Sequence, residues 1–151
     1  MTDHIELRKV WEMSAMLRRN FEIVLAASNV SRIAGSCLSA SILLQQHLDK
    51  FLGCESVVRG GDGLHDGGAK DTAGVWHGHY WVEGVTPDVF PFLADITADQ
   101  FGWAPVVVLP LVDARARYIP GDDDLCARAV DVEIDRINQA VYVVDSEFLS
   151  Q

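Results

Sequence analysis

The sequence predicts an α+β domain with a mainly antiparallel sheet, and two observations support this. Residues 5–27 and 37–52 carry apolar side chains at helical spacing, without an internal glycine or proline. Residues 55–112 instead show short apolar runs, some with strict alternation, separated by glycine and proline. Helices and strands are therefore grouped along the chain, which favours an antiparallel sheet over alternating parallel units.

The composition is that of one folded globular domain over residues 1–151, with 49% hydrophobic and 23% charged residues. Acidic residues outnumber basic residues by 22 to 12, which gives a net charge of −10. Nucleic-acid binding needs a basic face, and an anionic membrane would repel this chain. No apolar run approaches the ~18 residues of a membrane-spanning helix. We therefore expect neither nucleic acid nor a membrane among the partners.

The first residues and the cysteines predict a cytoplasmic protein. Residues 1–6 are acidic where a signal peptide would be basic, and no apolar segment of the signal-peptide kind follows them. Three cysteines are an odd number in a chain long enough to build its own core. This favours reduced thiols over a disulfide scaffold, and Cys54 and Cys126 are interpreted as structural.

The helix expected over residues 37–52 has a signal at each end. Ser36 stands at the N-cap and Gly53 at the C-terminal stop. Its apolar stripe begins with the nucleophile candidate discussed below. The stripe consists of Cys37, Ala40, Leu44, Leu48 and Phe51.

The β-rich stretch and the C-terminus predict further elements. Strands are expected at residues 55–59, 75–84, 89–97 and 106–112, with a one-turn excursion at 98–102. The glycine-rich residues 60–68 are expected to form a loop, either a lid over a cleft or an ordinary flexible loop. A last helix is expected from 122 to about 140, followed by a strand at 141–144.

Cys37 is the most informative residue for chemistry. A cysteine in the first turn of a helix feels free backbone N–H groups and the positive end of the helix dipole, which favour thiolate over thiol. The same N–H groups can hold a tetrahedral oxyanion. Taken alone, a cysteine on an apolar stripe is more typical of a buried core thiol.

His79 and Asp95 follow Cys37 at spacings that suit a catalytic pair. His79 comes 42 residues after Cys37, on the expected strand, and Asp95 comes 16 residues after His79. Two neighbouring antiparallel strands can place this carboxylate against the imidazole, where it fixes the tautomer. The alternative interpretation of Asp95 is a turn or cap residue beside Thr97.

Three segments together resemble the transglutaminase-like branch of the papain-like superfamily. They are Gly35-Ser36-Cys37, His79-Tyr80-Trp81-Val82-Glu83 and Asp95-Ile96-Thr97-Ala98-Asp99-Gln100-Phe101. That superfamily includes transglutaminases, transglutaminase-like peptidases, arylamine N-acetyltransferases and glutamine-deamidating effectors. The resemblance covers residues 35–102. It implies a papain-like, transglutaminase-core fold in which the cysteine-bearing helix packs on the sheet.

The resemblance also implies roles for individual residues. Cys37 would be the nucleophile, His79 the general base and acid, and Asp95 the residue that orients His79. The reaction would be hydrolysis or acyl transfer through a thioester, on an amide-bearing protein, peptide or small molecule. It needs no cofactor and no metal. Hydrolysis is favoured, because a short chain leaves little room for an acceptor site.

Four further residues are candidates for substrate binding: Asn29, His77, Trp81 and Gln100. Asn29, eight residues before Cys37, stands in for the oxyanion-hole glutamine of papain-type enzymes. His77 shares the expected strand face with His79 and either lines the cleft or faces solvent. Trp81 is either a core residue or a wall of the substrate slot. Gln100 is a cleft residue by the resemblance, or a turn residue.

Two other interpretations of the chain remain. His77 and His79 can chelate zinc with Cys54, His65 or Asp66, although no Cys-x-x-Cys or His-Glu-x-x-His pattern supports this. The alternative to an enzyme is a catalytically inactive papain-like binding module. The distance between Cys37 and His79 in the fold distinguishes the enzyme from the module.

Overall fold

The computed structural model describes residues 4–27 and 36–149 and has an α+β fold. In chain order its elements are α1 (Ile5–Ala27), α2 (Cys37–Leu52), β1 (Glu55–Gly61), β2 (Gly68–Lys70), β3 (Trp76–His77), β4 (His79–Val85), β5 (Pro91–Asp95), the 3-10 helix η1 (Ala98–Phe101), β6 (Val107–Pro110), α3 (Leu111–Ala114), β7 (Tyr118–Ile119) and α4 (Asp123–Leu149). None of these helices combines the length and apolar character that a membrane span requires, within the described residues.

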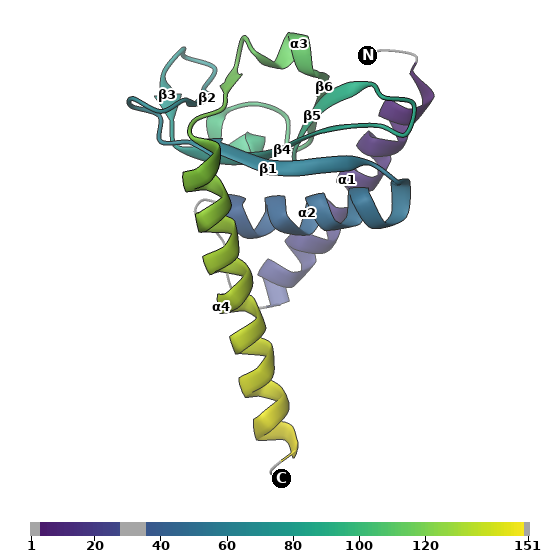
Figure 1. Ribbon diagram of the computed structural model, residues 1–151, viewed down its shortest axis with the longest axis vertical. Helices are drawn as coiled ribbons and strands as arrows, with labels where there is room; N and C mark the ends of the chain where they lie inside the picture. Colours follow the sequence, from purple (N-terminus) through teal and green to yellow (C-terminus); the bar gives the residue numbers. More distant parts are fainter. Residues whose placement is uncertain (1–3, 28–35, 150–151) are drawn as a thin grey trace.

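The elements form three layers around a four-stranded antiparallel sheet of order β1-β4-β5-β6 (Figure 1). Helices α1 and α2 pack on one face of this sheet. A three-stranded antiparallel sheet of order β3-β2-β7 lies with α3 on the other side. The long helix α4 begins beside β1 and runs past α2 away from the sheet. The α+β class and the mainly antiparallel sheet are therefore confirmed.

Both N-terminal helices have the bounds that the sequence predicts. Gly53 ends α2 in the left-handed region at φ 69°, and the Cys54 N–H bonds back to the Leu48 carbonyl at 3.2 Å. One member of the predicted stripe is wrong. Phe51 is 59% exposed, because the helical period carries the buried face from Leu48 to Leu52 instead.

Two apolar clusters cover the two faces of the four-stranded sheet. The cluster under α1 and α2 includes Val82 of β4. The cluster on the opposite face includes its neighbour Trp81 and, from β7, Tyr118. Because side chains alternate along a strand, His79 and Glu83 point to the same face as Trp81. The site described below therefore lies on the face turned toward the smaller sheet.

The glycine-rich region departs from the predicted loop. Gly60 and Gly61 belong to β1, and Gly68 begins β2, a strand that the sequence did not predict. A Cβ on Gly61 would lie 2.3 Å from the Asp66 carbonyl oxygen and from the Gly68 amide nitrogen. These glycines therefore permit close backbone contact between neighbouring segments. The local sequence pattern does not show whether a glycine has this role or lies in a loop.

The expected strand over residues 75–84 is also wrong in one respect. It divides at Gly78 into β3 and β4, which belong to different sheets. Gly78 lies against the loop after β1, with its Cβ position 3.1 Å from the Asp62 carbonyl oxygen. His77 and His79 are therefore not on one continuous strand face.

Several elements in the second half of the chain differ from the prediction. Val89 adopts φ 64° in the turn, so β5 begins only at Pro91. The expected strand over 106–112 ends at Pro110, and α3 follows. The expected strand at 141–144 is instead part of α4, because no glycine or proline interrupts residues 123–149 and the helix continues. The 3-10 helix η1 confirms the one-turn excursion.

We expect Gly61→Ala to destabilise the protein by about 1–3 kcal/mol, because the new methyl group meets backbone atoms that cannot turn away. Gly78→Ala is the matched control, since its nearest neighbour is 3.1 Å away and a small displacement relieves the contact. Urea unfolding of both variants measures the difference. Equal stabilities would contradict the close packing of β1 against residues 66–68.

Candidate active site

The structure brings His79 and Asp95 together as a buried pair. β4 and β5 are antiparallel neighbours with Val82 opposite Ala94, which sets the two residues diagonally across the strands. His79 Nε2 lies 2.8 Å from Asp95 Oδ2, and the two side chains are 0% and 1% exposed. The carboxylate therefore holds one ring nitrogen of the imidazole, the arrangement that orients the ring of a catalytic histidine.

Asp95 accepts hydrogen bonds on both carboxylate oxygens. Besides His79, Oδ2 accepts from the Tyr118 hydroxyl at 2.8 Å. Oδ1 accepts from the Thr97 amide at 2.9 Å and from the Thr97 hydroxyl at 3.3 Å. Burial raises the pKa of Asp95, but the charge of His79 and these hydrogen bonds outweigh it, so the pKa lies below its usual range. The buried carboxylate is therefore ionised and saturated with donors.

His79 is held in its protonated form. Burial alone lowers the pKa of the imidazole, because it disfavours the charged ring. The charge and hydrogen bond of Asp95, together with a hydrogen bond to the Cys37 side chain, raise the pKa to about 9. At neutral pH the site therefore contains an imidazolium in contact with a cysteine.

Cys37 is the first residue of α2 and is half-buried. The first intrahelical bond of α2 joins the Ala40 N–H to the Ser36 carbonyl at 3.0 Å. The N–H groups of Cys37 and the two residues after it precede this bond and have no acceptor within the helix. The thiol thus lies where backbone donors and the helix dipole favour a negative charge.

The other two cysteines lie in a different environment. Cys54 and Cys126 are buried, and burial raises the pKa of each to about 11. The Cys126 thiol donates to the Val58 carbonyl at 3.3 Å. No histidine is among the groups that shift either pKa, and burial disfavours both thiolates, as expected for structural thiols.

Gln100 lies against the second nitrogen of His79. Its Nε2 atom is 3.2 Å from His79 Nδ1 and 3.5 Å from the Thr97 hydroxyl oxygen. Because Nε2 of His79 faces Asp95, Nδ1 is the nitrogen that remains for Cys37. The 3-10 helix η1 therefore places an amide side chain next to the reactive atoms, as the cleft interpretation of Gln100 requires.

His77 lies apart from the His79–Asp95 pair and has its own carboxylate partner. Its Nε2 atom is 2.7 Å from Asp71 Oδ2, and the side chain is 41% exposed. The ring stacks on Phe101 at 5.0 Å, and Phe101 in turn meets the His79 ring edge-on at 4.7 Å. His77 is therefore at the rim, separated from His79 by an aromatic ring.

The zinc interpretation is wrong for the part of the chain that the structure describes. There, no group of three or more histidine, cysteine, aspartate or glutamate side chains is placed to hold a metal ion. The break at Gly78 gives His77 and His79 different carboxylate partners, and Cys54 is buried in the core under the helices. The two histidines belong to different sheets and contact the Phe101 ring between them, so they do not converge on one ion.

The interpretation of Trp81 as a wall of the substrate slot is wrong. Trp81 is 0% exposed, its indole N–H donates to Glu83 Oε1 at 3.0 Å, and its ring meets that of Tyr118 at 5.2 Å. The strand alternation places Trp81 on the face covered by the smaller sheet, where it is a core residue next to His79. Asn29 lies outside the described residues.

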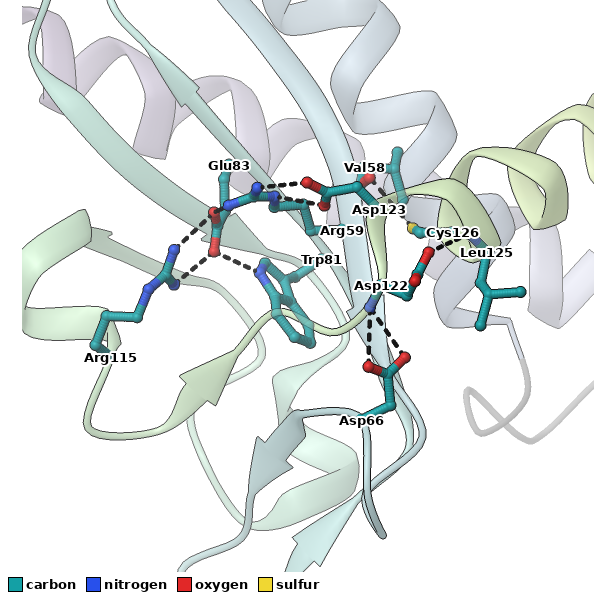
Figure 2. A network of polar contacts seen from close by, with 10 residues as sticks. All are labelled: Val58, Arg59, Asp66, Trp81, Glu83, Arg115, Asp122, Asp123, Leu125 and Cys126. Carbon is teal, nitrogen blue, oxygen red and sulfur yellow. Dashed lines mark hydrogen bonds and ion pairs between the residues drawn. The ribbon is translucent and has the colours of Figure 1, made fainter.

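Glu83 is the centre of a polar network that the sequence did not predict (Figure 2). Its carboxylate is 4% exposed and accepts from Arg115 at 2.6 and 2.9 Å and from Arg59 at 2.8 Å. Burial raises its pKa, but Arg115, Trp81 and Arg59 together lower it below the usual range. A carboxylate on a buried strand face needs a cationic partner. Only the fold shows that Arg115, 32 residues away along the chain, is such a partner.

Arg59 also connects this network to α4. Its guanidinium donates to Asp123 at 3.2 and 3.0 Å, at the first turn of that helix (Figure 2). Asp66 accepts from the Asp122 amide at 3.0 and 2.9 Å. The glycine-rich loop is thus bound to the start of α4.

A surface hollow of about 350 Å³ lies beside this loop. It is lined by Gly60, Gly61, Asp62, Asp66, Tyr80, Asp122, Leu125 and Cys126. Burial raises the pKa of Tyr80, and the charges of Cys126 and Cys37 contribute. Tyr80 therefore lines the hollow and lies near enough to Cys37 for the charge of that residue to act on it.

The described geometry can perform nucleophilic and acid–base chemistry on a carbonyl group. It offers a thiol at a helix start, an imidazolium in contact with it, and a buried carboxylate that orients the imidazolium. Gln100 adds an amide that can bind a polar substrate group. No family model, curated protein or solved structure matches this chain, so the site stands on its own geometry.

Proposed function

We propose that this protein is a thiol-dependent amide hydrolase or acyl transferase that acts through a thioester on Cys37. The observation that carries the proposal is the buried His79–Asp95 pair in contact with a cysteine at the start of α2. The same arrangement supports a papain-like fold of the transglutaminase-like branch, with cysteine on a helix and histidine and aspartate on adjacent antiparallel strands.

The first half of the reaction forms the thioester. The Cys37 sulfur attacks the amide carbonyl carbon, and the N–H groups at the start of α2 stabilise the oxyanion. His79 then gives its Nδ1 proton to the amide nitrogen as the C–N bond breaks, and the amine leaves. Asp95 keeps the imidazole oriented and stabilises the charged ring before this transfer.

The second half releases the acyl group. Water attacks the thioester carbonyl while His79 accepts its proton, and the C–S bond breaks to give a carboxylic acid and the Cys37 thiolate. An amine in place of water would give acyl transfer instead. We favour hydrolysis of a peptide-type or glutamine amide, on a protein, peptide or small molecule.

Gln100 has a substrate-binding role in this scheme. The Gln100 N–H₂ group lies against His79 Nδ1, the nitrogen that remains for Cys37. An amide group at this position can donate to a polar atom of the substrate. This makes Gln100 a candidate donor to the substrate carbonyl, beside the helix N–H groups.

The pH profile of Cys37 alkylation tests the proposal without a known substrate. The native protein is treated with iodoacetamide between pH 5 and 9, and each cysteine is quantified by mass spectrometry. At pH 6 we expect Cys37 to react at least ~10-fold faster than Cys54 and Cys126, because only Cys37 is paired with an imidazolium. His79→Ala is expected to remove this advantage.

His77→Ala is the matched control for that experiment, because it removes an imidazole that does not contact Cys37. It is expected to leave the profile unchanged. If Cys37 is inert, or reacts only in the range of an ordinary thiol, the enzyme proposal is wrong and the inactive binding module takes its place. If Cys37 is activated, peptide amides and glutamine are the first substrates to test, with Cys37→Ala as the inactive reference.

A further inference from the structure

Tyr118 contacts the catalytic pair from outside the four-stranded sheet. It lies on β7, in the smaller sheet, and is 1% exposed. Its hydroxyl donates to Asp95 Oδ2 at 2.8 Å, the same oxygen that lies 2.8 Å from His79 Nε2. One carboxylate oxygen is therefore shared by two donors, one from each sheet.

A clamp, consisting of the buried Glu83 and Trp81 and the half-buried Arg115, holds Tyr118 in this position. Arg115 binds both oxygens of Glu83, at 2.6 and 2.9 Å (Figure 2), and also donates to the Tyr118 carbonyl at 3.3 Å. Trp81 donates to Glu83 and packs its ring against that of Tyr118. The clamp joins β4, which carries His79, to the segment that carries Tyr118.

The Tyr118 hydroxyl acts only as a donor in the working pH range. Burial raises its pKa far above the usual value, and the charge of Asp95 raises it further, against a smaller opposite effect of Arg117. A donor on a carboxylate oxygen withdraws negative charge from it and weakens it as an acceptor for other donors. Tyr118 thus reduces the hold of Asp95 on the His79 proton.

We propose that Tyr118 is a positioning residue that sets, through Asp95, how tightly His79 holds its proton. Among the described residues, the titratable groups that contact this pair are the Cys37 thiol from α2 and the Tyr118 hydroxyl from β7. For catalysis the inference rests on the proposed function. In that reaction, His79 gives a proton to the leaving amine, and this transfer is slower when His79 holds the proton too tightly.

An NMR titration of the His79 imidazole tests the inference directly. In Tyr118→Phe, Oδ2 accepts from His79 alone, and we expect the pKa of His79 to rise by about one unit. Tyr80→Phe is the matched control, because Tyr80 is a half-buried tyrosine of the same site without a bond to Asp95 in the structure. It is expected to leave the His79 titration unchanged.

A second probe keeps the hydroxyl and the fold. Site-specific replacement of Tyr118 by 3-fluorotyrosine gives a more acidic phenol and a stronger hydrogen bond to Asp95. We expect the pKa of His79 to fall, opposite in sign to the Tyr118→Phe effect, which a merely structural role would not produce. If Tyr118→Phe does not fold, the sign of this shift decides alone.

The outcomes separate the two proposals. An unchanged His79 titration in both Tyr118 proteins, or shifts of the same sign, would overturn the role of Tyr118 even with an activated Cys37. An ordinary alkylation profile of Cys37 in the unaltered protein would overturn the enzyme proposal, whatever the titration shows. Opposite shifts support Tyr118 as a positioning residue.

Discussion

Asp95→Asn is expected to lower the stability of the protein by about 3 kcal/mol at pH 7, since it removes one partner of a fully buried ion pair. His79 then loses its main counter-charge, and burial lowers the pKa of the imidazole from its value in the parent. The rate of Cys37 alkylation at pH 6 is expected to fall together with the pKa of His79. Urea unfolding and the alkylation rate measure the two effects.

The pH dependence of this stability loss has a definite sign. His79 has a folded pKa of about 9, above its ordinary value of 6.5. Its contribution to stability is therefore complete below pH 6.5 and is lost as the pH rises through 9. Asp95 has a lowered pKa, so its contribution is present above its unfolded pKa and is lost as the pH falls through the folded value. The difference between parent and Asp95→Asn is therefore largest near pH 5–6 and narrows above pH 9.

Asp71→Asn is the matched control, because it removes the carboxylate of the half-exposed His77 pair. Solvent screens that pair, so the expected loss is much smaller than that of Asp95→Asn. A loss from Asp95→Asn that stays constant from pH 5 to 10 would contradict a charged His79 in the folded protein.

Glu83→Gln is expected to destabilise the protein by about 3 kcal/mol, the second large effect. The Glu83 carboxylate is buried between Arg59 and Arg115. A glutamine amide removes the negative charge that both arginines bind, and it turns an N–H₂ group toward one of them. The Tyr118 segment should loosen as well, because Arg115 loses its anchor. Urea unfolding and the His79 titration report the two consequences.

Glu6→Gln is the control for this prediction. Glu6 pairs with Lys9 at 3.0 Å, and the lysine is 51% exposed. Such a surface pair contributes little, so the expected change is within about 0.5 kcal/mol. Equal losses from Glu83→Gln and Glu6→Gln would show that the clamp does not stabilise the fold.

Much of the helical framework could be predicted because its signals are local. The bounds of α1 and α2 follow from uninterrupted helical spacing, and Gly53 supplies the left-handed residue that ends α2. Strand signals were less complete. β7 has only two residues. The local pattern of Gly60 and Gly61 predicts a loop, although their pairing with β4 makes them part of β1.

The candidate site was predicted in part for the same reason. The order of Cys37, His79 and Asp95, each at a recognisable place in an element, needs only local pattern and a family resemblance. The partners of the site carry no such signal. Tyr118 and Arg115 reach Asp95 and Glu83 from 23 and 32 residues away along the chain, and nothing near them in sequence indicates the pairing.

Helix limits, the alternation of β4 and the position of Cys37 at a helix start are consequences of interactions between residues a few positions apart. Whether a strand face is open or covered depends on segments distant in sequence, and this is why Trp81 is a core residue and His77 a rim residue. The smaller sheet covers that face, breaks the expected strand at Gly78 and supplies the Tyr118 hydroxyl. Backbone periodicity cannot encode such contacts, because they exist only when the two sheets pack together.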